Sequence, residues 1–131
     1  ERYKLYMFAF ENIDNLMVLD KIKLLINSCK VGIGPNIFQL SSDYISNIID
    51  CISEKENNAL QTLVILLYLD SLSLENEEYS TIFRHFLYKL GISEKEIEND
   101  RTRKIIIDSL SMNGKFEYKS ACMLFDLATE S

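Results

Sequence analysis

ALQTLVILLYLDSL, residues 59–72, contains the longest apolar run of the chain and decides its fold. Apolar side chains occupy nearly every position, so this stretch lacks the polar face that a surface helix shows. Leucine dominates it, and the β-branched aliphatic residues are only Val64 and Ile65, which favours a helix over a buried strand. We therefore predict a central helix that other helices surround.

The segment that follows has the clearest amphipathic pattern of the chain. Its apolar residues recur at steps of three and four: Tyr79, Ile82, Phe83, Phe86, Leu87 and Leu90. Gly91 comes next, where a helix end favours glycine. We predict that Phe83 and Phe86 anchor the core together with Leu66 and Leu69 of the central helix.

Weaker stripes predict the remaining helices. They lie at about 13–29, at about 42–52, from Asp100 or Thr102 to Leu110, and from about Glu117 onward. The predicted inward face of the first helix consists of Ile13, Leu16, Met17, Val18, Ile22, Leu25, Ile26 and Cys29. Ser93 and Glu96 form a predicted capping box at the start of a further short helix, which precedes the one from Asp100 or Thr102. Residues 1–10 suit either a short helix or an extended arm, and VGIGPN (31–36) and Asn113-Gly114 are turn sequences.

These elements predict one all-α domain over residues 1–131, a compact bundle of about six to eight short helices. The apolar share of 47% is that of an ordinary globular chain, and a chain of this length can bury a real core. The sequence begins with Glu1 and not Met, which leaves open that it is a piece of a longer protein.

Charge and cysteine content narrow the classes of partner. The net charge of −6 argues against nucleic acid and favours a basic or apolar protein surface, while Arg101, Arg103 and Lys104 fit a solvated helix turn. The longest apolar run is too short for a membrane span, which needs about 20 residues. Three cysteines without a CxxC pair predict buried structural thiols in a reducing, cytoplasmic protein. The pattern indicates no particular oligomeric state.

Two stretches echo each other: LDSLSLENEEYS at 69–80 and IDSLSMNGKFEYKS at 107–120. A third place, at Asn27-Ser28, follows the same plan of an aliphatic helix, a polar pair, a loop and an acid-tyrosine pair. The acid-tyrosine pairs are Asp43-Tyr44, Glu78-Tyr79 and Glu117-Tyr118. Repeated helix–loop–helix units explain the echo, and so does reuse of the same capping chemistry.

The stretch LQTLVILLYLDSLSLENEEYSTIFRHFLYKLGISEKEIE, residues 60–98, resembles the TerB-type helical domain of tellurite-resistance proteins. LLINSCKVGIGPNIFQLSSDYISNIID, residues 24–50, resembles the first half of its internal duplication. The resemblance implies a divalent cation such as calcium, held by Asp70 with Glu77 or Glu78. The chain departs from the family pattern at Ser71, where glycine is usual, and at Asn27, where aspartate is usual.

The residues themselves favour other roles for these acids. Glu77 and Glu78 suit a helix N-terminus, and Leu72 and Leu74 exclude an EF-hand loop that starts at Asp70. At a helix C-terminus a carboxylate faces the negative end of the dipole, so we expect Asp70 and Asp108 to accept loop amides in Asx-turns. A cation that bridges two helices is the alternative.

Catalytic chemistry is not indicated. His85 is the sole histidine, no carboxylate lies four residues from it, and no zinc or nucleophile-elbow motif accompanies it. We therefore predict a non-catalytic protein–protein interaction domain with no cofactor and no catalytic residue. A TerB-like, cation-binding regulatory module is the alternative. A small enzyme is a third reading, which a pocket joining His85 to carboxylates would favour.

Overall fold

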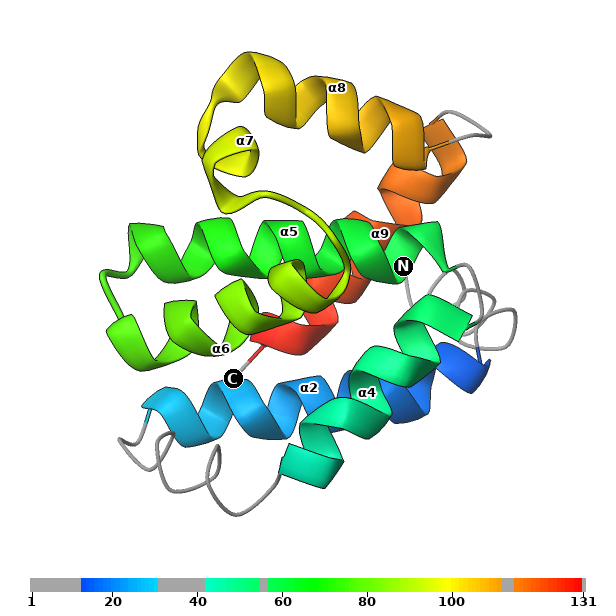
Figure 1. The fold of residues 1–131 in the computed structure, drawn as a ribbon. Helices are drawn as coiled ribbons and strands as arrows, with labels where there is room; N and C mark the ends of the chain where they lie inside the picture. The colour runs from blue at the N-terminus through cyan, green and yellow to red at the C-terminus, as the bar shows by residue number, and fades with distance from the viewer. Residues whose placement is uncertain (1–12, 31–41, 55–56, 112–114, 131) are drawn as a thin grey trace.

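The computed structural model describes residues 13–30, 42–54, 57–111 and 115–130. Within these ranges the chain forms seven helices and no strand, which confirms the all-α prediction. The helices are α2 (Ile13–Lys30), α4 (Ser42–Glu54), α5 (Asn58–Ser73), α6 (Glu77–Lys89), α7 (Glu94–Glu98), α8 (Asp100–Leu110) and α9 (Lys115–Thr129), as Figure 1 shows. The expected arm at 1–10 and the turns at 31–36 and 113–114 lie outside the described residues.

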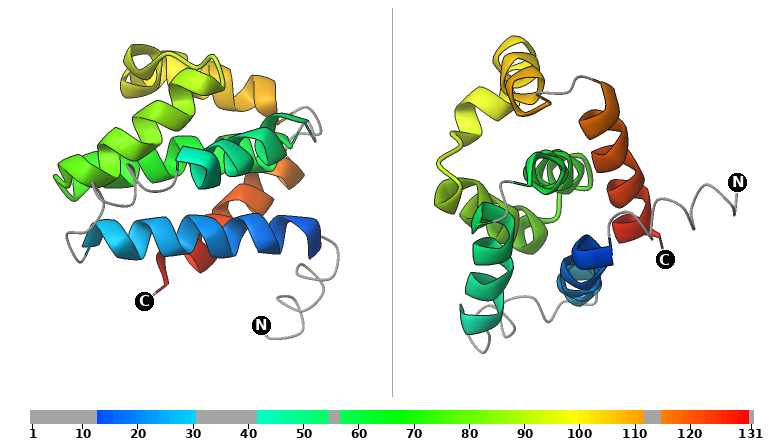
Figure 2. Two further views of the ribbon diagram at one scale, coloured as in Figure 1. Left: turned by 60° about the horizontal axis from the view of Figure 1, so that its bottom comes forward. Right: turned by 90° about the vertical axis from the view of Figure 1, so that its right-hand side faces the viewer.

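Helix α5 is the centre of the bundle, as its sequence predicts. It packs against α6, α8 and α9, while α2 contacts α4, α6 and α9 (Figure 2, right). Most of its side chains are buried because neighbours cover it on several sides: Ala59, Leu60, Thr62, Leu63, Val64, Ile65, Leu67, Tyr68 and Ser71. None of the helices in the described ranges is long and apolar enough to cross a membrane.

The aromatic residues of α6 form a cluster of contacting rings in the core. Phe83 and Phe86 are fully buried, and their rings stack with centroids 5.2 Å apart. The Tyr79 ring meets Phe83 edge-on at 5.4 Å. The expected partners on α5 differ in part: Leu66 and Leu69 are only half-buried, and the fully buried leucines of that helix are Leu60, Leu63 and Leu67.

The inward face of α2 also differs from the prediction. Met17 is 69% exposed, whereas Leu19 is buried. The buried positions Val18, Ile22 and Leu25 define the axis of the face, and Met17 lies about 100° away from Val18 on a helix. Leu19 lies on the other side of that axis. It is buried because α2 contacts three other helices, which together cover a wider part of its surface.

Main-chain hydrogen bonds end α5 and α6 in the same way. At the end of α6, Gly91 has φ +76°, its amide donates to Tyr88, and the amide of Ile92 donates to Leu87. At the end of α5, Glu75 takes the same left-handed conformation, with φ +54°. Its amide donates to Leu72 and that of Asn76 donates to Ser71. Both ends are Schellman motifs, and Gly91 is confirmed as a helix stop.

The Asx-turn expected at Asp70 is therefore wrong. The loop amides of Leu74, Glu75 and Asn76 donate to main-chain carbonyls instead of to the Asp70 carboxylate. That carboxylate accepts from the Tyr79 hydroxyl across the α5–α6 turn, at 3.0 Å. Asp108 is exposed, so the echoed aspartates do not share one environment.

Helix starts are capped by asparagines. The side chains of Asn57, Asn76 and Asn99 accept amide hydrogen bonds at the starts of α5, α6 and α8. The capping box predicted at Ser93 and Glu96 is wrong, because the Ser93 side chain makes no cap hydrogen bond. The main chain of Glu96 instead accepts the Thr102 hydroxyl, which ties α7 to the start of α8.

Substitutions at the two left-handed positions, Gly91 and Glu75, should change the free energy of unfolding in opposite directions. Gly91→Ala is expected to cost about 1 kcal/mol, since an L residue is strained there. A Cβ at position 91 meets no atom within 4 Å, so no clash adds to this strain. Glu75→Gly should gain up to about 1 kcal/mol for the converse reason. Urea unfolding of both variants measures this, and a stabilised Gly91→Ala or a destabilised Glu75→Gly contradicts the assignment of these turns.

Candidate functional site

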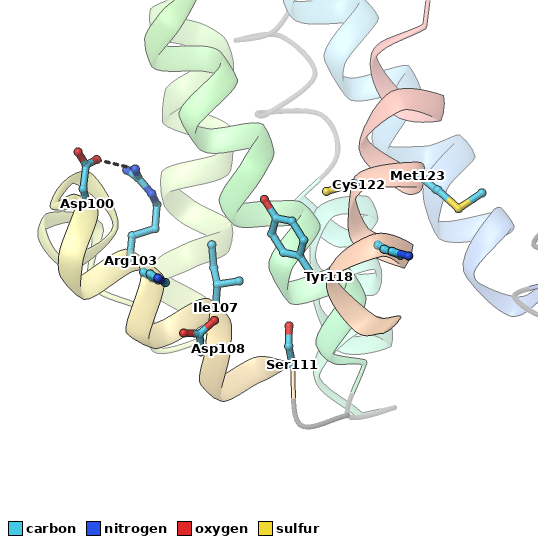
Figure 3. A pocket seen from close by; sticks show the side chains of 10 residues that line it. Asp100, Arg103, Ile107, Asp108, Ser111, Tyr118, Cys122 and Met123 are labelled. Atoms are coloured by element: carbon cyan, nitrogen blue, oxygen red, sulfur yellow. Dashed lines mark hydrogen bonds and ion pairs between the residues drawn. The ribbon is translucent and has the colours of Figure 1, made fainter. Parts of the chain in front are cut away.

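A groove of about 1110 Å³ lies between α8 and α9 (Figure 3). It exists because the two helices both pack on α5 but each also packs on a second neighbour that the other does not contact closely. Helix α8 lies on α7 and α5, whereas α9 lies on α5 and α2. Helix α8 has no fully buried residue, so its apolar face is only partly covered by the bundle.

Each wall of the groove is one face of a helix. From α8 come Ile107 and Ser111, which are four residues apart and therefore neighbours on its surface. From α9 come Tyr118 and Cys122, with the same spacing. Tyr118 is 42% exposed, and Ile107 and Cys122 are half-buried, so the groove offers apolar surface that the core does not use.

The rim of the groove is charged. Among the described residues, three of its side chains are basic, namely Arg103, Lys104 and Lys119, and two are acidic, namely Asp100 and Asp108. Arg103 is held in place because its guanidinium donates to the Asp100 carboxylate and, at 3.0 Å, to the carbonyl of Ile97. Lys104 and Lys119 are exposed. Two residues of the basic cluster expected to be a solvated helix turn, Arg103 and Lys104, thus form part of a concave surface, while Arg101 is exposed and does not line it.

Two hydroxyl groups lie in this groove. Ser111 is 8% exposed, and its Oγ has no hydrogen-bond partner. The pKa of Tyr118 is raised by the adjacent Cys122 thiol and by partial burial, while Arg103 opposes the shift. Tyr118 is therefore a neutral phenol at physiological pH, available as a donor or acceptor.

Sequence reasoning missed this groove because it treated the helix from Asp100 or Thr102 to Leu110 as one more apolar stripe and did not ask what its run Ile105 to Ile107 faces. Consecutive residues on a helix point about 100° apart, so three of them cannot all face the bundle. In the structure Ile105 is 62% exposed and Ile107 lines the groove. The signal was present in the sequence as a run too dense for one helix face.

A smaller pocket of about 540 Å³ lies beside α6 and α7 and contains His85 and Glu94. This is the arrangement that the enzyme reading requires. The Glu94 carboxylate, however, forms an ion pair with Arg84 and accepts from the Tyr68 hydroxyl at 3.4 Å. Arg84 also lies over the Tyr68 ring, 5.9 Å from its centroid. These contacts give Glu94 a structural role in joining α7 to α5 and α6.

The three candidate metal ligands are spread around the start of α6. Asp70 is half-buried and hydrogen-bonded to Tyr79, and Glu77 is exposed. Glu78 carries a buried Oε2 atom without a hydrogen-bond partner and lies close enough to Cys29 to act on its thiol. In the described part of the chain, no three or more His, Cys, Asp or Glu side chains gather as a metal-ion site.

Cys29 is expected to react slowly with alkylating reagents in the folded protein. Burial, with a further contribution from the Glu78 charge, raises its pKa from 9.0 to about 11. At pH 9 the thiolate fraction then falls about 50-fold below that of an ordinary thiol, and the thiolate is the nucleophile. Iodoacetamide labelling at pH 9, followed by peptide mass spectrometry in the folded and urea-unfolded protein, measures this ratio. Labelling of Cys29 at equal rates in both states contradicts its buried position.

The same shift makes stability fall at alkaline pH. Because the folded pKa is higher, the folded state holds the proton more tightly, so this contribution is complete below pH 9 and declines toward pH 11.

Comparison with protein-family models, curated proteins and solved structures gives no significant match to this chain. The resemblance to TerB-type domains therefore stays a prediction.

Proposed function

We propose that this chain is a non-catalytic α-helical protein–protein interaction domain, and that the α8–α9 groove receives a segment of the partner. The observation that carries the proposal is the combination of an open groove with half-buried apolar walls and a charged rim. Exposed apolar surface of this kind, with tyrosine, methionine and arginine around it, is typical of partner sites.

The setting we propose is cytoplasmic, within a larger chain or complex. The three cysteines, Cys29, Cys51 and Cys122, are free thiols, which supports a reducing compartment. A TerB-like cation-binding module is the second candidate. It is favoured by one observation, the buried oxygen of Glu78 without a hydrogen-bond partner, next in sequence to the Tyr79 whose hydroxyl bonds Asp70.

The groove function is tested with a displayed library of random peptides about 14 residues long, selected against the intact domain. Binders are then measured by fluorescence anisotropy against Tyr118→Ala, which removes an exposed aromatic side chain from the groove. We expect a loss of about tenfold or more, the size typical of an interface anchor.

The matched control is Tyr88→Ala, which removes a 77% exposed tyrosine from α6, outside the groove. It should leave the affinity within about twofold of the wild type. A selection that yields no binder sensitive to Tyr118→Ala contradicts the proposed function.

A further inference from the structure

We infer that the partner segment is an acidic amphipathic helix, an inference that rests on the proposed function of the groove. The charge of the groove differs from that of the molecule. The chain carries 20 acidic and 14 basic residues, yet of the five charged side chains that line the groove in the described part of the chain, three are basic. A partner with carboxylates on its flanks therefore meets attraction here and repulsion over most other surfaces.

Among the described residues, the positive charge of the groove that is not held in an ion pair belongs to the two lysines. Arg103 is already paired with Asp100, whereas Lys104 and Lys119 are exposed, one on each wall. Their positions on opposite walls let an inserted segment place acids on both of its flanks. Asp108 lies on the α8 wall and limits how many acids that side accepts.

The walls favour a helix as the occupant. Both are helices whose main-chain groups are bonded internally, and the described residues contain no strand whose edge could pair with an extended peptide. Helix α8 has 11 residues and is about 16 Å long, which matches about three turns of a partner helix. The apolar positions Ile107, Tyr118 and Cys122 suit a stripe of residues at i, i+4 and i+7.

Ser111 gives independent evidence that a ligand belongs in this groove. Its hydroxyl is buried and unpartnered at the end of α8, and its side chain lies between the two walls in Figure 3. A buried hydroxyl without a partner is unfavourable, and a polar group of an inserted segment would satisfy it. Nucleic acid fits less well, because it carries a phosphate at every nucleotide and would also meet Asp100 and Asp108, whereas a peptide can place its carboxylates beside the lysines alone.

The library selection described above also tests this inference, because it leaves the charge of the peptides free. We expect the binders that depend on Tyr118 to be enriched in Asp and Glu around an i, i+4, i+7 apolar stripe. The double variant Lys104→Glu/Lys119→Glu should weaken the best of these peptides by about tenfold or more, and added salt should weaken the wild-type complex.

The control variant Lys30→Glu/Lys89→Glu makes the same change of charge at two exposed sites outside the groove. It should change the affinity by less than about threefold. Circular dichroism of both double variants should match that of the wild type, which checks that they keep its fold.

The outcomes separate the two claims. Basic or neutral binders that still need Tyr118 overturn the acidic partner and leave the proposed function standing. The absence of any Tyr118-dependent binder overturns both. Self-association that Tyr118→Ala abolishes in sedimentation experiments overturns the acidic partner in favour of a second copy. Displacement of the peptide by a 20-nucleotide single-stranded RNA that binds more tightly overturns it in favour of nucleic acid.

Discussion

Phe83→Ala is expected to lower the free energy of unfolding by about 3–5 kcal/mol, as truncation of a fully buried phenylalanine does. The Phe83 side chain is fully buried. Its ring stacks on Phe86 at 5.2 Å and meets the edge of Tyr79 at 5.4 Å, so its removal leaves a cavity bordered by two rings. Equilibrium unfolding in guanidinium chloride, followed by far-ultraviolet circular dichroism, measures the change.

Two variants on the same helix serve as controls. Phe83→Leu keeps most of the buried volume and should cost clearly less than Phe83→Ala. Tyr88→Ala removes a ring that is 77% exposed and should stay within about 0.5 kcal/mol of the wild type. A cost below about 1 kcal/mol for Phe83→Ala would show that this face of α6 is exposed in solution, and would make it a rival partner surface.

The sequence was sufficient where a local pattern determines the structure. The dense apolar stretch at 59–72 predicts the central helix, because only a helix covered on several sides has no need of a polar face. The stripe from Tyr79 to Leu90 and the stop at Gly91 follow from helical spacing and from left-handed backbone geometry in the same way. None of these conclusions needs knowledge of a distant neighbour.

The predictions are wrong where the structure of one segment depends on contacts with another segment. Ser93 is a residue type that often caps helices, but its side chain makes no cap hydrogen bond. The Thr102 hydroxyl instead donates to the main-chain carbonyl of Glu96. Met17 is exposed and Leu19 is buried, in contrast to the predicted face, because their burial depends on which helices contact α2. The partner of Asp70 is a tyrosine nine residues later, which becomes a neighbour only when the turn folds back.

The groove illustrates the limit of composition. A net charge of −6 predicts a basic or apolar partner, but it says nothing about where the basic residues lie. Arg103 and Lys104 come from α8 and Lys119 from α9, and only the packing of both helices around α5 places them around one groove. Local charge, and not the sum, decides which segment can dock.

Asp70→Ala is expected to cost about 1–3 kcal/mol, because it leaves the buried Tyr79 hydroxyl without an acceptor. The hydroxyl donates to the Asp70 carboxylate at 3.0 Å, and Tyr79 is fully buried. Burial, followed by the nearby Asp70 charge, raises the pKa of Tyr79, so the phenol keeps its proton and remains the donor. Asp70→Asn should be milder, since the amide oxygen still accepts.

The matched comparison is a double-mutant cycle with Tyr79→Phe. Removing both partners leaves no unpaired group, so the double variant should lose less than the two single losses combined. Asp108→Ala removes an exposed carboxylate from the echoed sequence and should change stability by less than about 0.5 kcal/mol. Equal losses at Asp70 and Asp108 would restore a common role for the two aspartates.

The same variants decide between the hydrogen bond and a bound cation. A cation at Asp70 requires the carboxylate charge, so Asn would then be nearly as harmful as Ala. The wild type would also melt at a higher temperature with calcium than with a chelator, because a ligand that binds only the folded state stabilises it. A hydrogen bond alone gives calcium-independent melting, with Asp70→Asn close to the wild type. A calcium-dependent melting temperature that both variants lose would favour the TerB-like module over the interaction domain.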